Sequence, residues 1–296
     1  MANLKELRNR ITGVKNTSKI TSAMKMVSAA KLRRSQDAIE SARPYVKKLN
    51  EVMSNLVDAT SESYENPFSE SRANIENIAV VVIGSDRGLC GAFNNNLFKE
   101  ALSFINNDLK ASNPNANVSL IPVGKKAISF FKKYDLDKIS SFPDIFGKLE
   151  FSIAKDIVSD IKLKFISGEI DKVVVFVNEF VNIVRQNPSH HQLLPIESIS
   201  SESAKDSKFN SNYIYEPGQA EILDELIPKL IDISMWRFLL ESNAAEQAAR
   251  MMAMDNATRN ANELVDSLNL EYNRKRQAAI TTEMLEIVSG AEALSN

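Results

Sequence analysis

The two ends of this chain are predicted to be long helices with few breakers, and this feature limits the possible fold more than any other. The helical stretches cover residues 3–57 and about 218–289. At about 1.5 Å per residue, each would run on the order of 80 to 100 Å, far more than the width of a compact domain. A helix of that length needs a partner along most of it. Because the two stretches are alike in pattern, we expect them to pair with each other in antiparallel orientation.

The first stretch has a coiled-coil seam that small polar residues interrupt. Apolar residues recur at steps of three and four from Leu4 to Val14, which is the spacing of a coiled-coil seam. From Asn16 to Ser22 the seam positions are small and polar, so we expect a weak contact that slips easily. Pro44 predicts a kink.

The second stretch is expected to start with Pro217 at the first helical position and to bend or restart at Pro228. From Leu240 to Leu268 its stripe contains many alanines. Alanine lets two helices approach each other closely.

The net charge of −2 hides a strongly basic first segment. Residues 1–36 contain nine Lys and Arg residues and one acid, Glu6, so this segment carries +8 and the other 260 residues sum to −10. A solvated helix face normally interleaves the two signs in i,i+4 pairs. The surplus therefore indicates a polyanionic partner, which is a nucleic acid, an anionic lipid or an acidic protein surface.

The segments that would direct a chain into or through a membrane are absent from this sequence. There is no run of 18 apolar residues, and Met1 to Arg10 has no signal-peptide core. We therefore expect a cytoplasmic chain that is at most peripheral to a membrane and does not insert into it directly. Cys90 is the single cysteine, so an internal disulfide is excluded.

The middle of the chain alternates predicted strands with predicted helices. Short β-branched runs at Ile78–Ile83, Val118–Val123 and Val173–Val177 predict strands that are buried on both faces of a parallel sheet. Helices are predicted at 94–110, 125–134 and 149–166, extended edge segments at 180–186 and 191–199, and exposed polar segments at 61–74 and 198–212. The fold class is therefore α/β: a long antiparallel coiled coil of the terminal helices plus a central Rossmann-like domain. The expected domains are residues 1–60, 75–200 and 215–290.

A glycine-rich loop, Gly84–Gly91, follows the first strand, where an α/β protein would hold a phosphate. Its glycines fit neither GxGxxG nor GxxxxGK[ST], and no lysine is placed to reach a phosphate. A tight turn with positive φ angles is the favoured interpretation. The alternative is a nucleotide-binding enzyme that uses this loop.

Catalytic and metal-binding patterns are not found in the sequence. His190 and His191 are adjacent, so on a strand they face opposite ways and cannot hold one metal ion together. Cys90 has no His or Asn partner pattern and is interpreted as a packing residue or a loop contact. We expect no cofactor, no metal and no enzymatic activity of the chain itself.

The end of the second helix predicts an enclosing partner. After the basic cluster Arg274–Arg276, the tail to Val288 is apolar on most faces. A helix that is apolar all round is normally buried. We infer that another protein forms a sleeve around this tail, and that the basic segment lies in or just below the same sleeve.

Four stretches resemble the gamma-subunit family of bacterial F-type ATP synthases. They are Ile11–Arg34 (ITGVKNTSKITSAMKMVSAAKLRR), Ser85–Asn94 (SDRGLCGAFN), Ser242–Asn256 (SNAAEQAARMMAMDN) and Tyr272–Gly290 (YNRKRQAAITTEMLEIVSG). They occur in order at both ends of the chain and, with the helix, domain, helix plan, cover nearly all of it.

The resemblance implies a rotary shaft without catalytic activity. In this family the paired helices turn inside a hexamer of alpha and beta subunits, and the α/β domain meets epsilon on the membrane c-ring. The implied partners are the alpha, beta, epsilon and delta subunits and the c-ring. The implied function is to couple proton flow to ATP synthesis at the beta-subunit sites and to regulate ATPase activity and proton flow. The implied location is the cytoplasmic face of the bacterial inner membrane.

Five positions are implied as subunit contacts by the family motifs. Met24 resembles the methionine that faces an acidic loop of the beta subunit, and the neighbouring Lys25 adds a cation. Arg276, Gln277 and Thr281 resemble the residues that touch the catch loops of the beta subunit. The cysteine-containing insertion of the chloroplast relatives is absent, so thiol control is not expected.

A nucleic-acid-binding coiled coil is the third alternative, since the first helix is basic. However, no Phe, Tyr or Trp occurs before Tyr45, so bases could not stack on aromatic side chains there. We expect no nucleic-acid partner.

Overall fold

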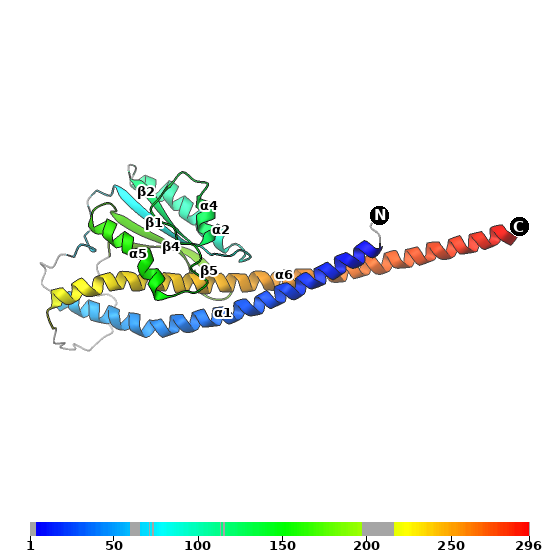
Figure 1. Ribbon diagram of the computed structural model, residues 1–296, viewed down its shortest axis with the longest axis horizontal. Coiled ribbons are helices and arrows are strands. Elements are labelled where there is room, and N and C mark those ends of the chain that lie inside the picture. Colours follow the sequence, from blue (N-terminus) through cyan, green and yellow to red (C-terminus); the bar gives the residue numbers. More distant parts are fainter. Residues whose placement is uncertain are drawn as a thin grey trace. The chain divides into compact units, whose positions relative to one another are not determined.

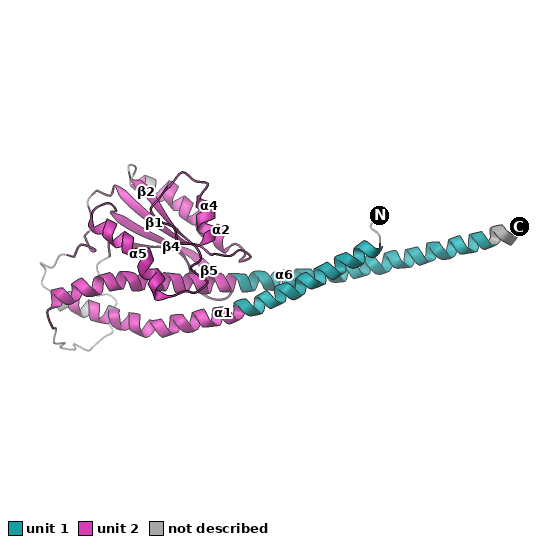
Figure 2. Ribbon diagram, viewed as in Figure 1, with its two compact units in different colours: residues 1–28, 250–296 teal, residues 29–249 magenta. Residues whose placement is uncertain are grey.

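The computed structural model describes residues 4–59, 66–70, 72, 74–112, 114, 116–196 and 216–295. The chain forms two compact units, one from residues 1–28 and 250–296 and the other from residues 29–249 (Figure 2). The long helices α1 (Leu4–Ala59) and α6 (Gln219–Ser295) contribute to both units. None of the helices, over the residues that the structure describes, has the length and apolarity needed to cross a membrane.

The first unit is an antiparallel helix pair, as the sequence predicts. Leu7 and Ile11 of α1 are buried in one cluster with Val265 and Leu268 of α6. In the polar pairs beside this cluster, Ser18 meets Asn262 and Lys25 meets Asp255, so residue numbers rise along α1 as they fall along α6. The apolar seam predicted from the spacing of its residues is therefore confirmed.

Both long helices continue through their internal prolines, which excludes the restart at Pro228, whereas the kink at Pro44 and the bend at Pro228 stay predictions. Helix α6 continues through Pro228 without a restart, and α1 continues through Pro44. Pro217 precedes the first helical residue, Gln219, by two positions instead of occupying the first helical position. Each internal proline removes one backbone hydrogen bond, but side chains packed along the helix hold it together.

The second unit contains a five-stranded sheet in the order β3-β2-β1-β4-β5. The strands are β1 (Asn77–Ile83), β2 (Asn117–Val123), β3 (Asp137–Lys138), β4 (Lys172–Phe180) and β5 (Gln186–Leu194). The first four run parallel, and β5 pairs with β4 in antiparallel orientation. The three buried strands expected from the β-branched runs are confirmed.

Helices cover both faces of this sheet (Figure 1). On one face α5 (Phe151–Ile166) and the long helices form a core that contains Val81, Val175 and Ile161. On the other face α2 (Phe93–Ser103) and α4 (Lys125–Phe131) bury Val80 and Phe176. Alternate residues of a strand face opposite layers, which explains why the sequence runs are continuously apolar.

Several predicted boundaries were wrong. The helix expected at 94–110 consists of α2, a π-helix η1 (Phe104–Leu109) and the short α3 (Lys110–Ser112). Helix α4 ends at Phe131, and residues 181–185 form a hairpin turn in place of an extended segment. In that turn the side-chain oxygen of Asn182 accepts hydrogen bonds from the N–H groups of Val184 and Arg185. The loop expected at 198–212 and half of the linker at 61–74 lie outside the described residues.

Candidate subunit-contact surface

Three polar pairs connect α1 and α6 where the seam loses its apolar residues. Ser18 Oγ donates to Asn262 Oδ1 over 2.7 Å, and the hydroxyls of Thr21 and Thr258 lie 2.7 Å apart. Lys25 Nζ donates to Asp255 Oδ1 over 2.6 Å. The three pairs share one register of the two helices. That this contact is weak and slips easily stays a prediction.

Met24 and Lys25 are both half-buried on this surface. The hydrogen bond from Lys25 lowers the pKa of Asp255, although partial burial opposes this shift. The cation that the sequence assigns to an external acidic loop is thus already paired within the helix pair. Apolar side chains beside it are open to solvent, since Ile20 is 61% and Met26 64% exposed.

The basic residues of the first segment lie on the surface. Lys25 is half-buried, and the other eight are exposed, namely Lys5, Arg8, Arg10, Lys15, Lys19, Lys31, Arg33 and Arg34. Their charges are therefore available to a partner of opposite sign.

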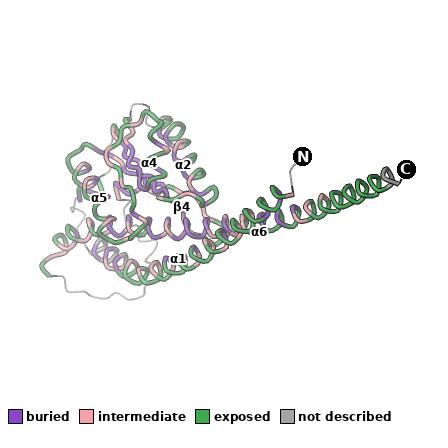
Figure 3. The backbone as a smooth tube through the Cα atoms, turned by 45° about the vertical axis from the view of Figure 1, so that its right-hand side comes forward, coloured by how far each residue is buried: buried purple, intermediate pink, exposed green. Residues whose placement is uncertain are grey.

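The last turns of α6 carry the other predicted contact residues. Tyr272 is half-buried against the cluster of Leu7 and Ile11, whereas every residue from Arg276 to Ala291 is exposed (Figure 3). Arg276, Gln277 and Thr281 belong to this open segment, in which Thr281 Oγ1 donates to the carbonyl oxygen of Gln277 over 3.0 Å. Large apolar residues are open there too, namely Ile280, Met284, Leu285, Ile287 and Val288.

The structure does not bring the five predicted contact residues together. Lys25 lies beside Asp255, and Thr281 follows Asp255 by 26 positions along α6. At 1.5 Å per residue this is roughly 40 Å along the helix axis. The candidate surface therefore has two separate parts, one around Met24 and Lys25 and one around Arg276, Gln277 and Thr281.

Asp86 of the glycine-rich loop in the second unit binds backbone N–H groups of two other segments. Asp86 Oδ1 accepts hydrogen bonds from the N–H groups of Lys125 and Asp144, and Oδ2 accepts one from the N–H of Phe146. The first of these N–H groups opens α4, and the other two belong to the segment that precedes α5. Asp86 therefore ties the glycine-rich loop to two other segments of the chain, which supports a structural role for the loop.

The glycines at this point permit a close approach of two chain segments. A Cβ on Gly84 would lie 2.8 Å from the ring of Phe98. Gly124 has φ +90°, and a Cβ there would lie 2.5 Å from the carbonyl oxygen of Gly84. The expected positive φ angles occur in this loop at Leu89 and Gly91. The interpretation of the motif as a tight turn is confirmed.

Cys90 and the two histidines take structural positions. Cys90 is buried against Phe93 and Ala245, as expected for a packing residue. His190 packs against Phe104, whereas His191 Nε2 lies 2.7 Å from Glu179 Oε1 and its ring stacks on Phe238. The two side chains therefore face opposite ways, as predicted. No cluster of three potential metal-binding side chains occurs among the residues that the structure describes.

The sequence interpretation missed the acceptors on α6, Asp255 and Asn262, and the second hydroxyl of the seam, Thr258. A signal for them does exist. It is the shared register of the three pairs: each position gained along α1 is matched by one position lost along α6, so any one pair places the partners of the other two within one residue.

Known proteins resemble this chain over almost its whole length. A family model described as ATP synthase matches residues 3–294. The ATP synthase gamma chain of Prosthecochloris aestuarii is 49% identical over 294 residues, which is 99% of each chain. The ATP synthase gamma chain of Chlorobium chlorochromatii is 48% identical over 295 residues and covers 100% of both chains.

Solved structures also share the fold. A chain of the central stalk and c-ring of the Tetrahymena thermophila mitochondrial ATP synthase has a TM-score of 0.57 at 26% identity, covering 80% of this chain and 99% of that one. A chain of the Euglena gracilis mitochondrial ATP synthase has a TM-score of 0.68 at 20% identity, covering 98% and 94%. The latter similarity is one of fold.

Proposed function

Because this chain belongs to the family of ATP synthase gamma chains, we propose that it acts as a non-catalytic shaft inside a ring of alpha and beta subunits. It is the central rotary stalk of an F-type ATP synthase and couples ion flow through the membrane ring to ATP synthesis. Catalysis takes place on the beta subunits, and this chain transmits the rotation. It thereby also regulates ATPase activity and proton flow.

The observation that carries this proposal is the open end of α6. Every residue from Arg276 to Ala291 is exposed, and five of these residues are large and apolar. Exposed apolar residues in a continuous segment of helix indicate a partner surface. An apolar sleeve would bury them without strong directional bonds, so the helix could still turn within it.

The proposed organisation has three segments. Residues 1–60 and 215–290 form the shaft, and residues 75–200 form the foot. The foot meets the epsilon subunit and the c-ring, while alpha and beta surround the shaft and delta completes the complex. This places the chain peripherally at the cytoplasmic face of the bacterial inner membrane.

The contact roles are also proposals. Met24 and Lys25 face an acidic loop of the beta subunit, and Arg276, Gln277 and Thr281 touch its catch loops. The exposure of Arg276, Gln277 and Thr281 supports this assignment. At the other contact, the exposed Ile20 and Val27, four residues before and three residues after Met24, supply apolar surface on the same side of α1.

Affinity purification of a tagged copy from native membranes tests the function. Alpha, beta and epsilon subunits should co-purify with the chain. The isolated chain should hydrolyse no ATP, and ATPase turnover by the chain alone would overturn the non-catalytic role.

Two neighbouring threonines allow a matched test of the catch-loop contact. Thr281 and Thr282 are both exposed, and each hydroxyl donates to the carbonyl four residues earlier over 3.0 Å. Successive residues of a helix point about 100° apart. Thr281→Ala should lower ATP-driven proton pumping per ATP hydrolysed, whereas Thr282→Ala should leave it near the wild-type value. Equal effects of the two substitutions would contradict a specific contact at Thr281.

A further inference from the structure

Strand β5 lies at the edge of the sheet. It pairs with β4 on one side, and no other strand among the described residues pairs with it. His190 is exposed, and Pro188 and Gln192 are half-buried. An edge strand of nine residues with an open side can pair with a further strand.

The position of Pro188 shows which backbone groups face outward. Pro188 pairs with Asn178 of β4 and has no N–H to donate. A proline can stand in this strand without costing a β4–β5 hydrogen bond only if Pro188 and Asn178 form a non-hydrogen-bonded pair. In such a pair the backbone N–H and C=O groups point away from the partner strand. By alternation, the N–H and C=O of His190 and Gln192 also point outward. The open edge of β5 thus offers two hydrogen-bond donors, the N–H groups of His190 and Gln192. It offers three acceptors, the carbonyl oxygens of the same two residues and that of Pro188.

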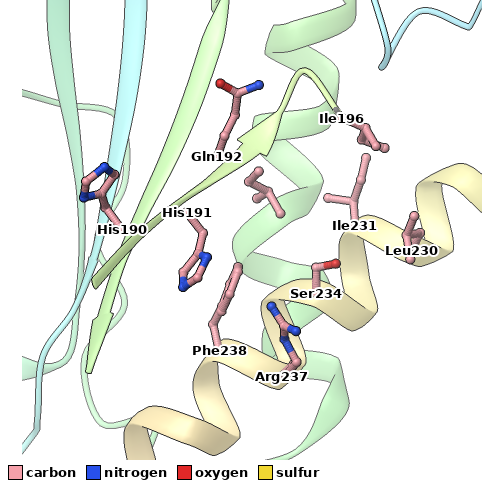
Figure 4. A pocket seen from close by; sticks show the side chains of 10 residues that line it. His190, His191, Gln192, Ile196, Leu230, Ile231, Ser234, Arg237 and Phe238 are labelled. Carbon is pink, nitrogen blue, oxygen red and sulfur yellow. The ribbon is translucent and has the colours of Figure 1, made fainter. Parts of the chain in front are cut away.

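A pocket lies on each face of this edge. The first, of about 360 Å³, is lined by His191 together with Leu230, Ile231, Ser234, Arg237 and Phe238 of α6 (Figure 4). The second, of about 390 Å³, is lined by Phe104, Asp108, Leu109, Lys172 and Val174. His190 and Gln192 line both pockets. The outward backbone groups therefore lie between two cavities.

We propose that β5 binds an extended segment of another protein chain, which adds a sixth strand to the sheet. Successive side chains of a strand point to opposite faces, so neighbouring residues of the added segment would enter the two pockets in turn. In such binding, main-chain hydrogen bonds supply affinity and the pockets supply specificity. A ligand without a backbone would leave the outward N–H and C=O groups unused.

The charges specify the added segment further. In the first pocket the side chain of Arg237 is 49% exposed, and its nearest carboxylate, Glu241 Oε1, is 3.9 Å from Nε, which is too far for a hydrogen bond. The guanidinium group can therefore accept an acidic side chain from the segment. The second pocket combines an apolar wall at Phe104 and Val174 with charges of both signs at Asp108 and Lys172, so it fits a side chain with an apolar stem and a polar end.

Hydrogen exchange, measured on the isolated chain and on the intact ATP synthase complex, tests this inference. The inference rests on the proposed function, because the partner is sought in that complex. The amides of His190 and Gln192 should exchange freely in the isolated chain and at least about 100-fold more slowly in the complex. Equal exchange in both states would overturn the inference. If the tagged chain does not bring down alpha and beta subunits, the proposed function fails instead, and the two failures can thus be told apart.

Proline substitutions at neighbouring positions distinguish the N–H groups of β5 that point outward from those that bind β4. His190→Pro removes an outward N–H together with the ring that packs against Phe104, and His190→Ala removes the ring alone, so the two variants should fold with similar unfolding temperatures but only His190→Pro should lose one subunit from the purified complex. His190→Ala keeps the N–H and should retain all subunits, and Arg237→Glu should weaken retention more than Arg237→Gln. His191→Pro removes an inward N–H and should destabilise the isolated chain. A His190→Pro complex with wild-type subunit ratios, or a dimer of the isolated chain with protected His190 and Gln192 amides, would overturn the inference.

Discussion

Lys25 Nζ lies 2.6 Å from Asp255 Oδ1, so the cation beside Met24 is paired with an acid of the opposite helix. The pair is partly open to solvent, with side-chain exposures of 45% and 34%. Asp255 also lies 3.5 Å from Arg259. One carboxylate therefore holds two cations at the level of the proposed beta-subunit contact. Substitutions of Lys25 change both the helix pairing and the charge presented to a partner.

A charge swap separates these two roles. Lys25→Glu places two carboxylates side by side and should lower the unfolding temperature. The double variant Lys25→Glu/Asp255→Lys restores an internal pair and should recover that temperature. It should still show a several-fold loss of ATP-driven proton pumping per ATP hydrolysed, because position 25 now repels an acidic loop. Full recovery of pumping in the double variant would show that Lys25 acts only within the helix pair.

Much of the fold could be predicted because local patterns determine it. A β-branched run such as Ile78–Ile83 favours a buried strand whatever surrounds it, and few breakers interrupt the terminal helices. The π-helix at Phe104–Leu109 could not be predicted, because one extra residue per turn leaves no mark in an apolar pattern. The short edge strand Asp137–Lys138 is likewise set by its neighbours in the sheet.

The sequence predicts the individual residues of the candidate surface but not their partners on the opposite helix. Motifs identify Met24, Lys25 and Arg276 as individual residues. The partner of Lys25 lies 230 residues away, so its identity depends on the register of two helices. That register is a property of the packed pair, so motifs alone do not give it, although they locate the residues of the polar stretch correctly.

Three glycines should respond differently to alanine. Gly124→Ala should lower the free energy of unfolding by more than about 2 kcal/mol, because its φ of +90° strains an L-residue and the new Cβ meets the carbonyl of Gly84. Gly84→Ala meets the ring of buried Phe98 and should also destabilise. Gly13 lies inside α1 with nothing within 4 Å of an added Cβ, so Gly13→Ala should stabilise by up to about 1 kcal/mol. Urea denaturation of the three variants checks this order.

Asp171 connects the segment before β1 to the segment before β4. Arg72 Nη1 donates to its Oδ1 over 2.6 Å, and the N–H groups of Glu76 and Asn77 donate to Oδ2 over 2.8 Å. Burial raises the pKa of Asp171, but these hydrogen bonds outweigh burial and the pKa is lowered overall. The carboxylate therefore stabilises the fold above the ordinary pKa of Asp, and this contribution is lost as the pH falls through the lowered value.

Asp171→Asn should destabilise the chain by about 2–4 kcal/mol at neutral pH, since it weakens charged hydrogen bonds and leaves Arg72 without its carboxylate. The difference in the free energy of unfolding between Asp171→Asn and the wild type should shrink under acid conditions. Urea denaturation at a series of pH values measures this difference and its pH dependence. Asp156→Asn, an exposed acid on α5, is a control that should change stability little. A difference that does not vary with pH would contradict the lowered pKa.

Glu241 titrates in the opposite direction. Burial raises its pKa; the charge of Arg237 opposes this rise, the carboxylate of Glu179 adds to it, and His191 and Arg43 lower the pKa. The folded chain therefore binds a proton more tightly than the unfolded chain. The stability contributed by Glu241 is fully present below the ordinary pKa of Glu and falls as the pH rises through the raised value.

Glu241→Gln removes this loss, because a glutamine stays neutral at every pH. At neutral pH the variant should be more stable than the wild type by no more than about 1 kcal/mol, since water screens part of the charge at this half-open position. Below the ordinary Glu pKa the two chains should be equally stable. Thermal unfolding between pH 4 and pH 8 measures this difference, with Glu263→Gln as a control at an exposed position of α6. A variant less stable than the wild type at neutral pH would mean that the attraction of Arg237 outweighs the burial of the carboxylate.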